Sequence, residues 1–131
     1  MTLFEECLKA LGPNKEILSY DETAMVFKSF IGNFHISKWG VVDWEAVDNR
    51  FTVGKVDDIS YVIETYRPSA TWQVCILWND SSLPCVKVDL NESLRVVDDI
   101  TAVSFDTWLY NDKDLYVIEF HHEGRITIGF I

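Results

Sequence analysis

Positive charge is scarce in this sequence. Its 131 residues include only 11 lysines and arginines against 21 aspartates and glutamates, a formal net charge of -10. A surface so poor in lysine and arginine argues against binding to nucleic acid, because phosphate contacts need those side chains. It argues equally against docking on an anionic membrane. The natural complement of such a chain is a basic protein.

Cysteine and histidine are scarce too. The three cysteines, Cys7, Cys75 and Cys85, are odd in number and lack paired spacing, which predicts reduced thiols in a cytoplasmic protein. Each is most simply a small buried hydrophobe. His121 and His122 are adjacent, and on a strand they would point to opposite faces of the sheet. We therefore expect no metal site and no cofactor.

Signatures of catalysis and targeting are missing from the sequence. The six glycines do not cluster into a phosphate-binding loop, and no G-x-S-x-G segment occurs. The stretch Met1–Leu11 carries Glu5 and Glu6 where a signal peptide would be basic. The longest uncharged stretch, Pro68–Asn79, is too short and polar to cross a bilayer. We expect a cytoplasmic protein that is not an enzyme and has no small-molecule substrate.

Apolar and aromatic side chains are plentiful. They make up 48% of the chain, with eight phenylalanines, five tyrosines and five tryptophans. A globular chain of this length buries roughly two-thirds of its unfolded surface, so it needs no disulfide or metal for stability. No repeat or linker interrupts the sequence. We predict a single domain over residues 1–131.

The first third of the sequence predicts two helices. Thr2 and Glu5 have capping-box spacing before an apolar stripe, and Gly12-Pro13 ends that stripe. The predicted elements are a helix from Thr2 to Leu11, an extended segment at Glu16–Leu18 and a helix that follows Ser19 or Asp21 and is stopped by Gly32-Asn33. The following segment, residues 34–54, is predicted to be a long loop with one helical turn at Trp44–Asp48.

Alternation of apolar and polar residues predicts strands in the rest of the chain. The predicted strands are Ile59–Tyr66, Trp72–Trp78, Leu83–Leu90, Ala102–Tyr110, Leu115–His121 and Arg125–Ile131. A short helical segment, capped by Asn91 or Ser93, is predicted to run to Asp99. Mostly short turns exclude a parallel sheet. The predicted fold class is α+β: two N-terminal helices followed by about six mostly antiparallel strands, in one curved sheet or two packed sheets.

The excess of negative charge is uneven. Residues 41–99 hold eleven acids against five bases, near the aromatic residues Trp39, Trp44 and Phe51. Aromatic anchors among acids are typical of a protein interface, since aromatics supply desolvated area and charges steer approach. Alternatively, the tryptophans belong to the core and the acids keep the chain soluble. The candidate partner-binding residues are Asp43, Trp44, Glu45, Asp48, Asp57 and Asp58, with Asp98 and Asp99 as a second acidic patch.

Two short segments resemble a known family. Thr2–Gly12 (T-L-F-E-E-C-L-K-A-L-G) is similar to the start of bacterial immunity proteins from contact-dependent growth inhibition (CDI) systems. Ser37–Trp44, which contains W-G-x-x-D-W, also resembles that family. The resemblance covers about the first third of the chain. It implies a cytoplasmic protein that binds and neutralises the toxin domain of a large exported protein. Many such toxins are nucleases, whose basic clefts would suit an acidic inhibitor.

Two other functions stay open at this point. The aromatic residues could line the pocket of a small ligand-binding or regulatory α+β domain. An enzyme could use dispersed carboxylates together with His121 or His122.

Overall fold

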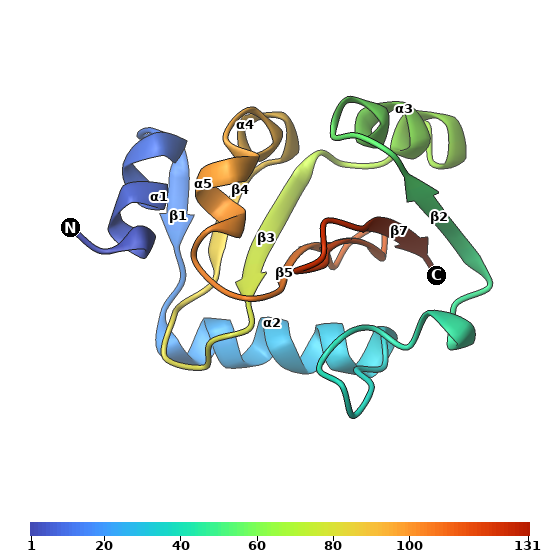
Figure 1. The fold of residues 1–131 in the computed structure, drawn as a ribbon, viewed down its shortest axis with the longest axis horizontal. Coiled ribbons are helices and arrows are strands. Elements are labelled where there is room, and N and C mark those ends of the chain that lie inside the picture. Colours follow the sequence, from blue (N-terminus) through green and yellow to red (C-terminus); the bar gives the residue numbers. More distant parts are fainter.

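The computed structural model describes residues 1–131, which form one seven-stranded antiparallel sheet with helices on both faces (Figure 1). The helices are α1 (Leu3–Leu11), α2 (Tyr20–Asn33), α3 (Asp57–Tyr66), α4 (Leu90–Arg95) and α5 (Val97–Thr101), with one 3₁₀ turn, η1 (Trp44–Ala46). The strands are β1 (Lys15–Ile17), β2 (Asn49–Val53), β3 (Gln73–Trp78), β4 (Val86–Asp89), β5 (Thr107–Asn111), β6 (Tyr116–Phe120) and β7 (Ile126–Phe130). They are ordered β1-β4-β3-β5-β6-β7-β2. The predicted α+β class is confirmed, in its one-sheet form.

Both N-terminal helices begin at a capping box, the first at the predicted Thr2–Glu5 pair and the second after Ser19, one of its two predicted starts. The Thr2 hydroxyl accepts from the Glu5 backbone N–H at 3.1 Å, and the Glu5 carboxylate accepts from the Thr2 N–H at 2.9 Å. Ser19 and Glu22 repeat this arrangement at the start of α2. Each box satisfies two N–H groups that a helix start leaves unpaired. Gly12 then ends α1 with a φ of 77°, a conformation that glycine adopts most easily.

The sheet separates two hydrophobic cores. α2 covers one face, and α1, α3, α4 and α5 cover the other (Figure 1). Side chains alternate between the faces along each strand: Val74 and Ile76 pack toward α1 and α3, whereas Cys75 and Leu77 pack toward α2. Both faces of β3 are apolar, as its sequence predicts, because helices cover both.

The prediction of a strand at Ile59–Tyr66 is wrong, because this segment belongs to the helix α3. Ile59 and Ile63 are fully buried, one helical turn apart, whereas Tyr61, which lies between them, is 70% exposed. The apparent alternation is therefore part of a 3.6-residue period. Asp57 and Asp58 lie in the first turn, where negative charge is favourable to the helix dipole.

Three other boundaries differ from the prediction. β2 lies inside the predicted loop and pairs with β7 at the edge of the sheet. α4 is capped by neither Asn91 nor Ser93, because the Asp89 carboxylate accepts from the backbone N–H of Asn91 at 2.8 Å. β5 begins at Thr107 rather than Ala102, since α5 and a turn occupy the preceding residues. No helix is both long and apolar enough to span a membrane.

Strand register brings several loops to one end of the sheet. Trp78 pairs with Thr107, Thr107 with Phe120, and Phe120 with Ile126. The loops that continue from these strand ends, residues 79–84, 102–106 and 121–125, therefore share that end.

Candidate functional site

The W-G-x-x-D-W segment forms a tight hairpin over residues 35–43, called the Trp39 hairpin below. Ile36 and Val42 form an antiparallel bridge, and the Ser37 N–H donates to the Val41 carbonyl at 2.7 Å. Gly40 makes the turn with a φ of 81°. At the turn, the Trp39 side chain is 78% exposed. The hairpin therefore presents a large aromatic residue to solvent.

A buried carboxylate holds this hairpin on the sheet. Glu119 of β6 is 1% exposed, and its two oxygens accept three N–H groups. The donors are the Val42 backbone at 2.8 Å, the Trp44 indole at 2.8 Å and the Trp108 indole at 2.9 Å. No lysine or arginine pairs with Glu119, so these hydrogen bonds alone compensate its burial. Glu119 thus joins the base of the hairpin to the core.

The two tryptophans of the segment play different parts. Trp44 is half-buried, with its indole N–H on Glu119 and its ring against Gly129 of β7. A Cβ atom at position 129 would lie 2.6 Å from the Trp44 ring, so only glycine fits there. Trp44 thus packs against the core as a half-buried residue, whereas the alternative interpretation, which placed both tryptophans in the core, does not hold for Trp39. Trp39 is the exposed one.

The predicted acidic residues fall into three groups. Asp43, Glu45 and Asp48 surround η1; all three are exposed, and none makes a side-chain hydrogen bond or ion pair within the chain. Asp57 and Asp58 begin α3, at the other end of β2 (Figure 1). Asp98 and Asp99 are exposed on α5, which packs beside α1. The structure therefore does not gather all seven carboxylates into one patch.

Internal ion pairs neutralise little of this charge. A single lysine or arginine pairs with a carboxylate, Arg95 with Glu92 at 3.1 Å. The remaining acidic side chains have no basic partner from lysine or arginine, so their field extends into solvent. This negative field would attract a partner with a positively charged surface.

An apolar groove of about 640 Å³ lies beside α2, and sequence reasoning missed it. Its walls are α2, the Trp39 hairpin and loop residues 79–84, with Trp78 and Trp108 also lining it. The α2 residues that line it recur at helical spacing: Tyr20, Thr23, Ala24, Phe27, Phe30 and Ile31. This spacing was the available signal, because Tyr20, Ala24 and Ile31 extend the helix face on which Phe27 and Phe30 meet both the core and the groove. Only the fold shows that the outer part of this face stays uncovered.

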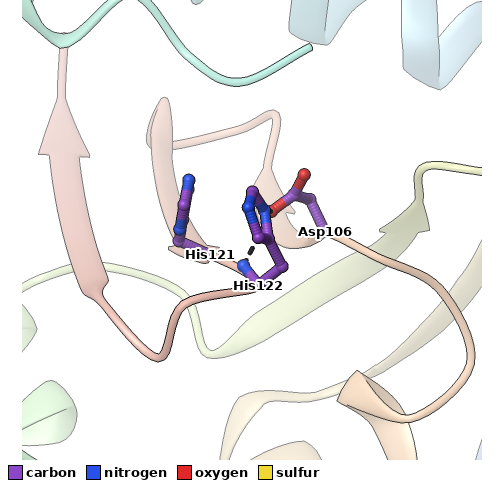
Figure 2. Close-up of side chains that lie close together, drawn as sticks. All are labelled: Asp106, His121 and His122. Atoms are coloured by element: carbon purple, nitrogen blue, oxygen red, sulfur yellow. Dashed lines mark hydrogen bonds and ion pairs between the residues drawn. The ribbon is translucent and has the colours of Figure 1, made fainter. Parts of the chain in front are cut away.

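Asp106, His121 and His122 lie close together (Figure 2), at the end of the sheet that loop residues 79–84, 102–106 and 121–125 share. The prediction that the histidines point to opposite faces is wrong, because β6 ends at Phe120 and both rings follow it in a turn. The two histidine rings are tilted by 30° with their centroids 4.0 Å apart, and the His122 ring stacks on Phe105 with a centroid distance of 3.9 Å.

Hydrogen bonds involve one carboxylate oxygen of Asp106 and the Nδ1 atom of each histidine in this cluster. The Asp106 carboxylate, 2% exposed, accepts from the His122 backbone N–H at 2.9 Å and lies 3.1 Å from His122 Nδ1. The Glu123 N–H donates to His121 Nδ1 at 3.1 Å. The potential ligand atoms of the three residues lie within 4.8 Å of one another, a spacing that could hold a metal ion. The arrangement joins the start of β5 to the β6–β7 turn.

The three cysteines are buried and unpaired, as predicted. Burial raises the pKa of the Cys7 and Cys75 thiols from 9.0 to about 11, and that of Cys85 to about 12. The thiolate is the reactive form, so these side chains are poor nucleophiles at neutral pH.

The folded protein should therefore resist alkylation. At pH 8 we expect its thiols to react with iodoacetamide at least about 100-fold more slowly than in urea, since a pKa two units higher leaves that much less thiolate. A raised folded pKa stabilises the fold below pH 9, and this stabilisation is lost as the pH rises through 11 to 12. If iodoacetamide labels the cysteine thiols at equal rates in the folded and unfolded states, then the cysteines are not buried as the structure shows.

Comparison with known families agrees with the resemblance seen in the two segments. Residues 1–129 match the family model described as CdiI immunity protein EcoliA0-like. The chain therefore belongs to the CdiI immunity protein family, and this membership implies an immunity protein against a toxin of contact-dependent growth inhibition. None of the curated proteins compared matches the chain. The likeness extends over nearly the whole fold rather than the first third.

Proposed function

We propose that this protein neutralises its cognate toxin by binding the toxin domain stoichiometrically in the cytoplasm, without catalysis of its own. Family membership over residues 1–129 carries the proposal. The net charge of -10, with one lysine- or arginine-carboxylate ion pair, supports a basic partner. Nuclease domains have basic clefts for phosphate, so we propose that the toxin is a nuclease.

The acids around η1 are the proposed steering surface. Asp43, Glu45 and Asp48 are exposed on a segment that the Glu119 network joins to the sheet, so their positions are defined before the partner arrives. Trp44 would contribute by holding this segment rather than by inserting into the partner. Exposed charges of this kind mainly raise the association rate.

The acids of the two other groups have secondary roles in the proposal. Asp57 and Asp58 would extend the negative surface along β2 to α3. Asp98 and Asp99 on α5 would add to the long-range field, from a position outside the η1 contact.

A ligand-binding domain is the second candidate, and the 640 Å³ groove is the observation that favours it. Small-molecule pockets span roughly 300–1,000 Å³ and are mostly apolar. Thermal-shift screening separates the two functions, because a ligand of the native state raises the apparent stability. Membership in an immunity family favours a protein partner.

Co-expression tests the proposed function in cells. A strain that produces the toxin domain encoded beside this chain should stop growing, and co-expression of the chain should restore growth to the uninduced rate. The control is the toxin domain from an unrelated CDI system, because immunity through specific binding should not protect against it. Failure to protect against the adjacent toxin would contradict the proposal, and so would protection against both.

A further inference from the structure

We infer that the groove beside α2 is where the toxin domain inserts apolar side chains, an inference that rests on the proposed function and names the surface used. The occupant is an apolar protrusion of the toxin, with basic residues nearest the first turn of α2. Four observations support this assignment: the uncovered helix stripe, the fixed walls, the exposed Trp39 and the distribution of charge.

The uncovered stripe is the first observation. α2 already packs on the sheet through Phe30, which is fully buried. A second set of side chains faces the groove, including Tyr20, 85% exposed, and Ile31, 47% exposed. Exposing this apolar surface costs free energy in water, and contiguous uncovered patches of this kind mark interaction sites.

The groove walls are held in place by hydrogen bonds. The Ser29 hydroxyl of α2 lies 2.7 Å from the Tyr110 hydroxyl of β5. On the opposite wall, the Asp80 carboxylate accepts from the Ser82 N–H at 3.0 Å and from its hydroxyl at 2.6 Å. The Trp39 hairpin is fixed by Glu119. Preformed walls reduce the ordering cost of binding.

Trp39 extends this surface beyond the groove. Gly40 lines the groove, and the neighbouring Trp39 side chain stands exposed under the Lys38 ammonium, which is 5.0 Å from the ring centroid. Tryptophan is enriched among the residues that dominate binding energy at protein interfaces. The hairpin and groove together supply both an anchor and a cleft.

Acidic side chains lie beside one part of the groove, where the first turn of α2 supplies Tyr20 and Thr23 to its lining. Asp21 and Glu22 lie in the first turn of α2, and Asp80 lines the groove wall. The bases Lys28 and Lys38 lie further along α2 and on the hairpin. A basic toxin domain would therefore place its positive residues beside the first turn of α2, with its apolar side chains in the groove.

Substitutions at Ala24 test the groove. Ala24 is exposed, lines the groove and lies within α2, where arginine and glutamate are good helix formers. We expect Ala24→Arg and Ala24→Glu each to weaken binding by about 30-fold, the effect of a hot-spot residue. Ile31→Arg should act in the same direction. The matched controls are Met25→Arg and Met25→Glu, since Met25 is 72% exposed on the same helix and does not line the groove.

The measurement is the Kd for the purified toxin domain encoded beside this chain, in a catalytically inactive form, with circular dichroism to confirm folding. The two Ala24 variants carry opposite charges and therefore separate obstruction of the groove from a change in charge. A purely electrostatic effect would make Ala24→Glu bind the basic toxin domain more tightly than wild type. That result would overturn the inference. Weakening by both Ala24 variants, with the Met25 variants within about twofold of wild type, would support it.

Failures of the two proposals are distinguishable. If the wild-type chain does not bind the toxin domain, the proposed function itself fails. If the wild type binds and the folded Ala24 and Ile31 variants bind equally well, the function stands and the groove assignment falls. A wild-type dimer that Ala24→Arg disrupts would assign the groove to a second copy and overturn the inference.

Discussion

Replacing Glu119 with alanine should lower the free energy of unfolding by on the order of 4 kcal/mol, the largest effect we expect from one substitution. Glu119 is buried and accepts N–H groups from Val42, Trp44 and Trp108. Its loss leaves these donors without a partner, and each unsatisfied buried donor costs about 1–3 kcal/mol. Part of that cost is offset because a buried charge is also removed.

The isosteric change Glu119→Gln separates hydrogen bonding from packing. Its amide oxygen can still accept, but its NH₂ group would face an N–H donor, so we expect a loss of about 2 kcal/mol. Urea denaturation followed by circular dichroism measures both variants. Both should also weaken toxin binding, because the Trp39 hairpin loses its attachment.

Glu123→Ala is the matched control for Glu119. Glu123 is an exposed acid in the turn after β6, and its removal should change stability by less than about 0.5 kcal/mol. If Glu119→Ala unfolds at the same urea concentration as this control, then the network does not hold the hairpin.

Reversing Asp43, Glu45 and Asp48 to lysine together should slow association with the toxin domain by about 10- to 100-fold at low salt. Each reversal adds two positive charges, so the net charge changes from -10 to -4. None of the three side chains bonds within the chain, so folding should be unaffected. The difference should shrink with added salt, since exposed charges are screened. Stopped-flow association rates at two salt concentrations measure it.

A second triple variant controls for net charge alone. Glu6→Lys, Glu16→Lys and Glu123→Lys make the same charge change at exposed positions on α1, on β1 and in the β6–β7 turn. This variant should slow association less than the η1 variant. Equal slowing would mean that only total charge matters, and the η1 surface would lose its assigned role.

Locally encoded features could be predicted from the sequence. The helices α1 and α2 begin at capping boxes formed within four residues, and Gly12 ends α1 through its own backbone freedom. The strand β3 was predictable from its apolar composition. Such elements depend on neighbours along the chain, which the sequence displays directly.

Features that depend on distant contacts could not be predicted. α3 was predicted to be a strand because Ile59, Tyr61 and Ile63 alternate, and only the packed fold shows that Tyr61 faces solvent. Trp39 and Trp44 look equivalent in the sequence, yet Glu119, 75 residues beyond Trp44, holds only Trp44 against the core. The groove could not be predicted either, because it forms between α2 and residues 79–84, which are distant in the sequence and adjacent only in the fold.

Calorimetric titration of the purified toxin domain into this protein, with toxin activity measured on the same mixtures, tests the central claim most directly. We expect heat to saturate at one toxin domain per chain, and toxin activity to fall to zero at that same ratio. Absence of binding heat together with undiminished toxin activity in excess immunity protein would contradict stoichiometric neutralisation.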